Sequence, residues 1–263
     1  MDAAASGDIP SLDWLGAPID ARTCAACTHA PLRAEGGCEP GRSCMQDAYA
    51  RRIDRFFRTH KSLARQHLGH PYFEVRAIAA RYTELFNLPP LLQDPDETVR
   101  LQVALRVPQR LLRAMRDDPH REVRIRVAAR IDLAELRPMA ADADYQVRAI
   151  VARRLPPALL APLGHDADLQ VRLEVARRLE MPALRAMADD PAAEVRRVAA
   201  ERLPVDALDC LAADPDWTVR WEVAGRAAAR LLLRLLQDPE AEVRERAAER
   251  LTAAAPPRES VHG

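Results

Sequence analysis

Four cysteines near the start of the chain have the residue type and the spacing of a metal site. They form the pattern C-x2-C-x10-C-x5-C within 21 residues and are Cys24, Cys27, Cys38 and Cys44. Two thiolates separated by two residues can bind one metal centre from a single tight turn. The pairs Gly36-Gly37 and Pro40-Gly41 flank Cys38 and let the chain wrap around a centre. The pattern predicts a four-cysteine metal site, but spacing alone leaves the metal open, and zinc is the commoner structural choice.

The composition of the chain indicates the cellular compartment of this site and the classes of partner that are excluded. The 39 Lys and Arg residues balance the 39 Asp and Glu residues, so no net field draws the chain to nucleic acid or to an anionic membrane. The first residues lack the basic start and apolar run of a signal peptide. No run approaches the roughly 18 apolar residues that span a bilayer. Clustered cysteines in such a chain indicate a reducing compartment, so we expect a cytoplasmic protein.

A 24-residue repeat fills most of the chain and must position the metal site. The pair Val-Arg recurs eight times at that spacing, with valines at Val75, Val99, Val123, Val147, Val171, Val195, Val219 and Val243. An Asp stands five residues before each valine except the first, and an Ala stands five residues after every valine. One such unit cannot bury its apolar stripe alone, so the repeat predicts a solenoid of stacked units.

Each repeat should contain one long and one short helix. Asp-Pro is expected to open the long helix, with Asp as the N-cap and Pro in the first turn. The valine and the residues four and eight positions later form its apolar stripe. A helix breaker directly after that stripe predicts its end, as at Pro108, Asp132, Pro156 and Pro204. About twelve residues remain, too few for a second full α-helix at about 1.5 Å per residue, so a short 3₁₀ helix is predicted.

The Arg after each valine falls inside the apolar arc and therefore needs a partner. The repeated Asp, six residues upstream in the same or an adjacent unit, is the candidate. The predicted charge ladder consists of Asp94, Arg100, Asp118, Arg124, Asp142, Arg148, Asp166, Arg172, Asp190, Arg196, Asp214, Arg220, Asp238 and Arg244. The alternative is an Arg stripe that binds phosphates. The regular acidic partners favour the structural interpretation.

The unit Asp-Pro-x-x-x-Val-Arg-x-x-Val-Ala-x-Arg-Leu-Pro-x-x-x-Leu-Leu-x-x-Met resembles the leucine-rich repeat variant family. That resemblance implies an all-α fold, a right-handed solenoid of eight repeats alternating α and 3₁₀ helices, with no β-sheet. Four cysteines ahead of such an array resemble the family's iron–sulfur segment. This implies a [4Fe–4S] cluster on the four cysteines, with zinc as the alternative. We expect a small metal-cluster domain with a helical cap at 1–68, the solenoid at 69–255 and a tail at 256–263.

Other candidate sites are weaker. His67 and His70 could share a metal, but at the cap they are expected to be ordinary polar residues. Cys210, in the apolar half of its unit, is expected to be a small core residue and not a ligand. Trp221 shares a repeat column with Leu101, Ile125 and Leu173, and Trp217 lies one turn away. These five side chains could pack between units or form an exposed strip for a partner protein.

The expected function is an iron–sulfur protein whose solenoid binds a partner macromolecule, a protein in the first instance, with the cluster structural or redox-active. The alternatives are an electron carrier or redox sensor and a helical-repeat nucleic-acid binder, which would need a one-sided Arg surface. No catalytic signature occurs, so we do not expect an enzyme. We expect a monomer that binds neither a membrane nor nucleic acid, and the sequence does not identify its partner.

Overall fold

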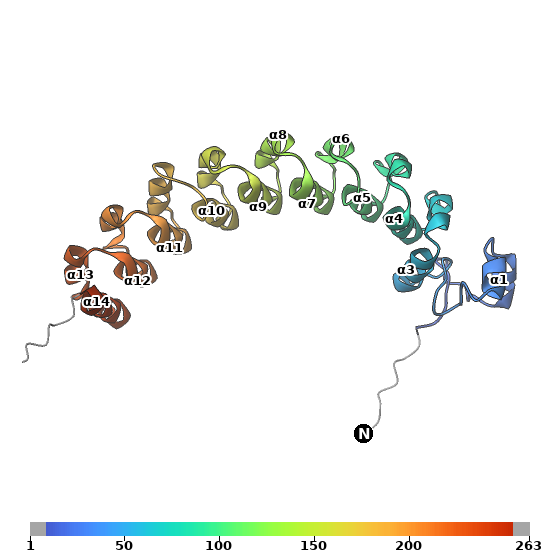
Figure 1. The fold of residues 1–263 in the computed structure, drawn as a ribbon, viewed down its shortest axis with the longest axis horizontal. Helices are drawn as coiled ribbons and strands as arrows, with labels where there is room; N and C mark the ends of the chain where they lie inside the picture. Colours follow the sequence, from blue (N-terminus) through green and yellow to red (C-terminus); the bar gives the residue numbers. More distant parts are fainter. Residues whose placement is uncertain (1–8, 255–263) are drawn as a thin grey trace, which may run out of the picture. The chain divides into compact units, whose positions relative to one another are not determined.

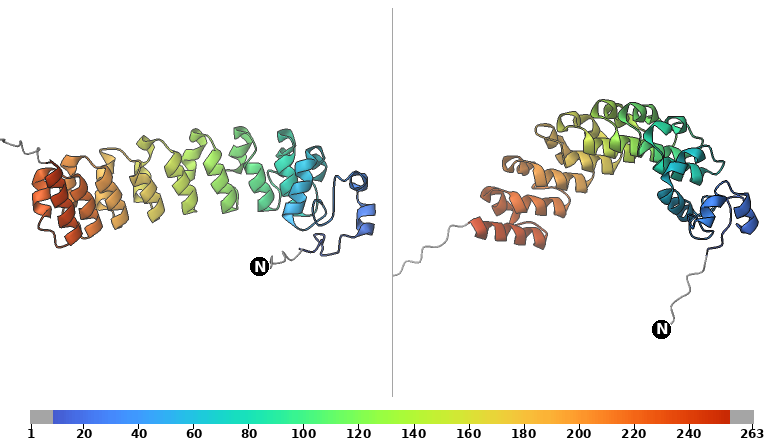
Figure 2. Two further views of the ribbon diagram at one scale, coloured as in Figure 1. Left: turned by 60° about the horizontal axis from the view of Figure 1, so that its bottom comes forward. Right: turned by 45° about the vertical axis from the view of Figure 1, so that its right-hand side comes forward.

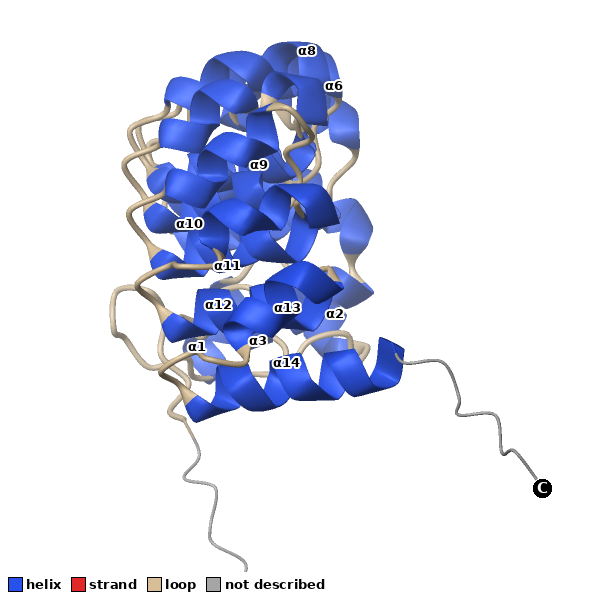
Figure 3. Ribbon diagram, turned by 90° about the vertical axis from the view of Figure 1, so that its left-hand side faces the viewer, coloured by secondary structure: helices blue, strands red, loops and turns tan. Residues whose placement is uncertain are grey.

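The computed structural model describes residues 9–254 as helices, turns and three isolated β-bridges, with no strand in that range (Figures 1 and 3). The all-α prediction is therefore confirmed. The chain divides into two compact units, Met1–Asp132 and Leu133–Gly263. The predicted tail at 256–263 and the first eight residues lie outside the described part, and the predicted boundary at 68/69 stays a prediction.

The first unit begins with short elements and continues into repeats. Its elements are α1 (Ala21–Ala26), α2 (Ala30–Ala34), α3 (Ala50–Thr59), η1 (Lys61–His67), α4 (Phe73–Tyr82), η2 (Leu85–Asn87), η3 (Pro89–Leu91), α5 (Glu97–Ala104), α6 (Gln109–Leu112), η4 (Arg113–Met115) and α7 (Arg121–Arg130).

The second unit contains repeats alone. Its elements are α8 (Leu133–Leu136), η5 (Arg137–Ala141), α9 (Tyr145–Arg154), η6 (Pro157–Leu159), η7 (Ala161–His165), α10 (Leu169–Ala176), η8 (Ala183–Asp189), α11 (Ala193–Arg202), η9 (Val205–Leu211), α12 (Trp217–Arg226), α13 (Ala229–Leu235) and α14 (Ala241–Ala254). Within each unit the long helices lie side by side, and the short helices follow one edge of the stack (Figure 2).

The predicted stripe forms the core of the stack. Val99, Val103 and Val107 are all fully buried, as are Val171 and Val175 in the second unit. Because these side chains recur at the same depth in each repeat, every interior repeat buries the same apolar face on its neighbours.

The prediction that Asp-Pro opens the long helix is wrong by two residues. Asp96, and not Asp94, is the N-cap of α5, and its carboxylate accepts the Thr98 N–H at 2.8 Å. The Asp94 carboxylate accepts the Asp96 N–H at 2.9 Å and so fixes the turn before the helix. Asp166 and Asp168 divide the two roles in the same way before α10. The repeated Asp therefore fixes the turn before the helix and does not cap the helix. Its carboxylate oxygens can also accept hydrogen bonds from an Arg.

The short second helix is 3₁₀ in several repeats, as in η8 and η9, each seven residues long. It departs from the prediction in three others, where it begins as α-helix in α6 and α8 and is wholly α-helical in α13. The α13 sequence contains only Ala, Arg and Leu. These are among the strongest helix formers, so the segment closes α-type hydrogen bonds despite its length.

A second Arg column, seven residues after each valine from Val99 onward, ties consecutive long helices together. Arg178 donates to the Ala152 carbonyl oxygen at 2.6 Å, and Arg202 donates to the Ala176 carbonyl oxygen at 2.7 Å. These carbonyls lie near the C-terminal ends of helices, where the backbone lacks intrahelical donors. Each of these Arg side chains therefore satisfies the helix end of the repeat before it.

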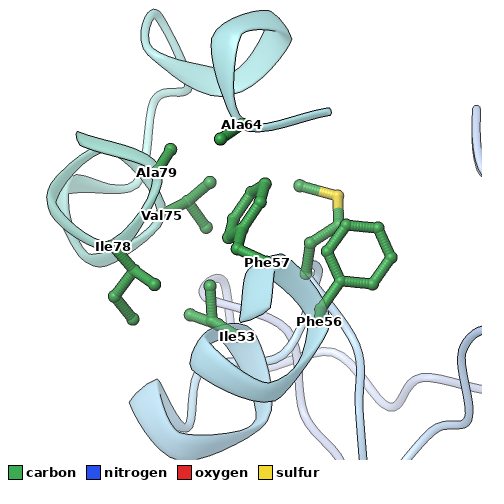
Figure 4. Close-up of a cluster of buried hydrophobic side chains, with 8 residues drawn as sticks. Ile53, Phe56, Phe57, Ala64, Val75, Ile78 and Ala79 are labelled. Carbon is green, nitrogen blue, oxygen red and sulfur yellow. The ribbon is translucent and has the colours of Figure 1, made fainter. Parts of the chain in front are cut away.

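A cap closes the first repeat within the first unit. Ile53, Phe56 and Phe57 of α3 pack with Ala64 of η1 and with Val75, Ile78 and Ala79 of α4, together with Met45 (Figure 4). Phe57 and Ile53 are completely buried. The apolar face that an earlier repeat would cover is thus covered by α3 and η1.

None of the helices in residues 9–254 combines the length and the apolar character needed to cross a bilayer.

Candidate metal centre

The four cysteines gather around one pocket at the start of the first unit. Cys24 lies on α1 and Cys27 follows its last residue, while Cys38 and Cys44 flank the turn around Gly41. All four line the same pocket, together with Thr23, His29, Arg33 and Gln46 among others. None forms a disulfide. The structure thus brings together the four residues that the sequence singled out.

Local backbone chemistry places each pair of cysteines. The Asp20 carboxylate caps α1 by accepting the Arg22 and Thr23 N–H groups, each at 2.9 Å. The helix ends where the Cys27 N–H donates to the Cys24 carbonyl oxygen at 3.3 Å, so both thiols leave one turn. The second pair is set by the Glu39–Ser43 bridge, which closes a turn containing Gly41 at φ +79°. That φ favours glycine because it lacks a Cβ.

The sulfur of Cys27 accepts hydrogen bonds as a thiolate ligand would. The His29 backbone N–H lies 3.4 Å from Cys27 Sγ, and the Gln46 side-chain amide lies 4.0 Å from the same atom. Hydrogen bonds to ligand sulfurs stabilise negative charge on them and tune the potential of iron–sulfur centres.

The pocket disfavours four ionised thiols unless a cation shares it. Burial raises the pKa of the Cys44 thiol to about 11. Burial also raises the pKa of Cys38, and the charges on Cys27 and Cys24 raise it further. Thiolates are the form that binds metals, and a bound metal supplies the positive charge that stabilises them.

The donor set fits an iron–sulfur cluster. Among residues 9–254, no three His, Cys, Asp or Glu side chains converge closely enough to hold one metal ion. All four cysteines nevertheless line one pocket. Four cysteine thiolates are the usual ligands of iron–sulfur clusters, so the residues that line the pocket include the donors that such a cluster takes.

A histidine pair connects this pocket to the cap. His29 Nε2 lies 2.8 Å from His67 Nε2, and the His29 ring packs on Phe56 with 5.2 Å between ring centroids. Burial lowers the pKa of His67 to about 4 and also lowers the pKa of His29. A neutral pair can donate from one ring and accept on the other. His29 is a site residue that the cysteine pattern alone does not predict, although its place two residues after Cys27 is a usable signal.

His70 fills the place that Asp fills in later repeats. Its Nδ1 accepts the Tyr72 N–H at 3.1 Å, just as Asp94 accepts the N–H two residues later. The His67 ring bonds instead to the His29 ring, and His70 meets His67 through the backbone, where the His70 N–H donates to the His67 carbonyl oxygen at 3.2 Å. Both histidines are thus polar residues of the cap, with defined structural partners.

In most repeats the Arg that follows the valine forms a two-sided contact. Arg100 donates Nε and Nη2 to the two carboxylate oxygens of Asp118 at 2.8 and 3.0 Å, and Nη1 to the Asp94 carbonyl oxygen at 2.7 Å. The carboxylate therefore comes from the following repeat, and the Asp six residues upstream contributes its backbone. The same bidentate pairs are Arg76–Asp94, Arg148–Asp166, Arg172–Asp190, Arg196–Asp214 and Arg220–Asp238.

The remaining ladder residues make part of this pattern. Arg124 donates to the Asp118 carbonyl oxygen at 3.0 Å, and Asp142 accepts the Asp144 N–H at 2.8 Å. Arg244 donates to the Asp238 carbonyl oxygen at 2.7 Å. The Nε and Nη2 atoms of each paired Arg bind both oxygens of one buried carboxylate. These guanidinium groups therefore point at carboxylates and not at solvent.

The predicted partner-binding column is not a continuous exposed strip. Ile125 and Leu173 are buried, with only 6% and 9% of their surface exposed. Leu101 is half-buried, and the half-buried Trp221 ring lies under the Arg246 guanidinium at 4.5 Å. Trp217 alone of the five is openly exposed, at 43%.

Cys210 also differs from its prediction. It is exposed, because it follows the buried Leu208 on a short helix whose other side faces solvent. It lies in the second unit, outside the lining of the cysteine pocket.

Known proteins share both parts of the chain. A family model described as "LRV protein FeS4 cluster" matches residues 11–66, and one described as "Leucine rich repeat variant" matches residues 145–168. An uncharacterized 27.7 kDa protein in the nifB 3′ region of Rhodobacter capsulatus is 47% identical over 97 residues. This match covers 37% of this chain and 38% of that protein.

A solved structure gives the broader match. It is described as a leucine-rich repeat variant with a novel repetitive structural motif, and it is 46% identical to this chain with a TM-score of 0.83. The match covers 86% of this chain and 97% of the other. This chain belongs to the leucine-rich repeat variant family, and an iron–sulfur cluster segment precedes its repeats.

Proposed function

We propose that this protein is a redox-active iron–sulfur protein that acts by binding a partner protein. The proposed centre is a [4Fe–4S] cluster on Cys24, Cys27, Cys38 and Cys44. The redox role is supported above all by the partial exposure of the cysteine side chains. Cys44 is buried, but Cys24, Cys27 and Cys38 are all partly exposed. A cluster on these ligands would lie near the surface, where a partner can exchange electrons with it.

The residues around the pocket support this role. A bound cluster supplies reversible electron transfer at a potential set by its ligands and surroundings. The His29 N–H and the Gln46 amide donate to Cys27 Sγ and so stabilise added negative charge there. Arg33 also lines the pocket, and its positive charge favours the more negative, reduced state in the same way.

The surface of the repeats supports a protein partner over nucleic acid. The exposed residue ten positions after the valine is apolar in several repeats of the second unit, where Leu133, Met181 and Val205 are 45–49% exposed. The paired Arg residues of the ladder already form ion pairs with Asp carboxylates. Phosphate binding would therefore require breaking internal pairs. That the chain is a cytoplasmic monomer and not an enzyme stays a prediction.

Potentiometric titration of the anaerobically purified full chain, followed by electron paramagnetic resonance, tests the redox role. We expect a reversible one-electron couple. Gln46→Ala should shift its potential to a more negative value without loss of iron, because a donor to Cys27 Sγ is removed. Gln66→Ala, an exposed change on η1, is the matched control. A cluster that cannot be reduced without being lost would show that it has only a structural role.

A further inference from the structure

The Arg–Asp ladder has an unfilled position at its last Arg. Arg244 donates Nη1 to the carbonyl oxygens of Asp238 and Pro239 at 2.7 and 2.8 Å. Arg220 makes the same backbone contacts, and its Nε and Nη2 also hold the Asp238 carboxylate at 2.7 and 2.9 Å. Within the described residues, no carboxylate accepts hydrogen bonds from Nε and Nη2 of Arg244. Its guanidinium is therefore held in place with one edge open.

An apolar seam lies beside this open fork. The Ala five residues after the valine is fully buried in the repeats before it, as at Ala200 and Ala224. In the last repeat the equivalent Ala248 is exposed. The residue eight positions after the valine behaves similarly, because Leu203 is fully buried whereas Leu251 is partly exposed. The end of α14 thus offers the surface that every earlier repeat covers with its successor.

We propose that this end of the solenoid is a docking face for a partner protein that inserts an aspartate or glutamate into the Arg244 fork. The partner lays an apolar helix over Ala248 and Leu251. Charge complementarity carries the inference, since six identical forks in this chain each hold a carboxylate. The inference rests on the proposed function and assigns a surface to its partner.

The chain itself shows what such a partner looks like. Leu231, Leu232 and Leu235 of α13 are buried, and Asp238 follows them and fills the Arg220 fork. The helix after Asp238, α14, packs on α12 and buries Val243 and Ala247, so an acidic turn followed by a helix with an apolar face covers this kind of seam. A bidentate Arg–carboxylate pair is specific in its geometry, so it would fix the register of the bound helix.

A second copy of the chain is a poor occupant. The first repeat carries His70 where later repeats carry Asp, and the adjoining face is covered by Ile53, Phe56 and Phe57. The copy would present neither the carboxylate nor an open apolar face. Head-to-tail self-association is thus disfavoured.

A labelled synthetic peptide with the sequence of residues 236–254 is the probe, since it carries Asp238 and the covering helix α14. Fluorescence anisotropy with the intact holoprotein should show saturable binding. Arg244→Ala should weaken it by roughly tenfold or more, since removing one partner of a desolvated charge pair costs at least that much. A peptide with Asn in place of Asp238 should be equally weak. Arg230→Ala, an exposed Arg on α13, should bind normally.

Exchanging the two charges between protein and peptide separates a loss of binding from a loss of folding stability in the Arg244 variants. Arg244→Asp should reject the natural peptide and bind a peptide carrying Arg in place of Asp238. Absence of saturable binding, or equal binding to Arg244→Ala, would overturn the proposal. Binding that appears only after residues 255–263 are deleted would overturn it in favour of the chain's own tail. In any of these cases an unchanged redox titration of Arg244→Ala would leave the proposed function standing.

Discussion

The cysteine segment and the repeats are held together by different forces. Between Asp20 and Gln46 the buried apolar side chains are those of Cys44 and Met45, and the chain relies on turns at Gly36 and Gly41. A repeat such as the one around α10 instead buries Val171, Val175, Ala176 and Leu179 almost completely. The segment has little core of its own, so its fold should depend on the metal centre.

This difference predicts how far local unfolding should spread from each region. A repeat is supported by its neighbours, so damage should spread only to adjacent units. The cysteine segment is joined to the cap by the His29–His67 bond and by the contact of His29 with Phe56. Loss of the centre should therefore loosen the cap as well as the segment.

The largest expected effect is that of Cys27→Ser or of iron removal. Without the centre, the four ligand side chains have no common partner, so hydrogen exchange should rise from residue 9 to about residue 100 while amides beyond Val147 stay protected. Cys210→Ser, which changes an exposed cysteine, is the control and should alter nothing. Unchanged exchange around Val75 and Val99 would show that the cap stands without the cluster.

The next effect tests the ladder inside the repeats. Arg172→Ala should cost on the order of 3 kcal/mol of unfolding free energy, because it leaves the Asp190 carboxylate buried and unpaired. The paired side chains are only 12% and 4% exposed. Arg177→Ala, in the same repeat but with a 53% exposed Arg side chain, should cost below about 0.5 kcal/mol in the same denaturant titration. Similar losses for both would contradict a structural ladder.

Acid should weaken the repeats through the same contacts. Burial raises the pKa of Asp166, but the hydrogen bonds from Arg148 and from the Asp168 N–H, together with the charges of Arg148 and Arg172, outweigh burial and lower the pKa below the ordinary 3.8. A carboxyl whose folded pKa is depressed stabilises the fold above its unfolded pKa and loses that contribution as pH falls through the folded value. Helix unfolding measured at falling pH should therefore show declining stability below about pH 4. Asp166→Asn should flatten that decline.

The smallest expected effect concerns helix caps. Asp216 caps α12 by accepting the Thr218 N–H, whereas Ala192 provides no side-chain cap for α11. Ala192→Asp should therefore stabilise the repeats by about 1 kcal/mol, and Asp216→Ala should destabilise them by a similar amount. Thermal unfolding of the two variants measures both. No gain at Ala192 would mean that tertiary packing alone determines where α11 begins.

The repeat core and the four cysteines could be predicted because periodicity and spacing encode them directly. The valine stripe follows from the helical period, and its burial at Val99 and Val103 needs no long-range information. The cysteines were found by residue type, and the structure places them around one pocket. Whether all four bind the cluster stays a prediction.

The details that could not be predicted depend on contacts between repeats. The Asp-Pro motif predicts an N-cap at Asp94, because the motif does not reveal that the Asp94 carboxylate bonds to Arg76 from the preceding repeat. Ile125 was placed on a possible surface strip because helix geometry gives its direction but not what lies over it. The His29–His67 bond spans 38 residues, so no local pattern contains it.

The most direct test of the central claim is the metal content of the chain. Protein purified without oxygen should be brown and should contain iron and acid-labile sulfide in equal amounts, held by Cys24, Cys27, Cys38 and Cys44. Cys27→Ser should lose both, and Cys210→Ser should keep both. Colourless protein with bound zinc and no sulfide would contradict the account, because a single zinc ion offers no redox chemistry.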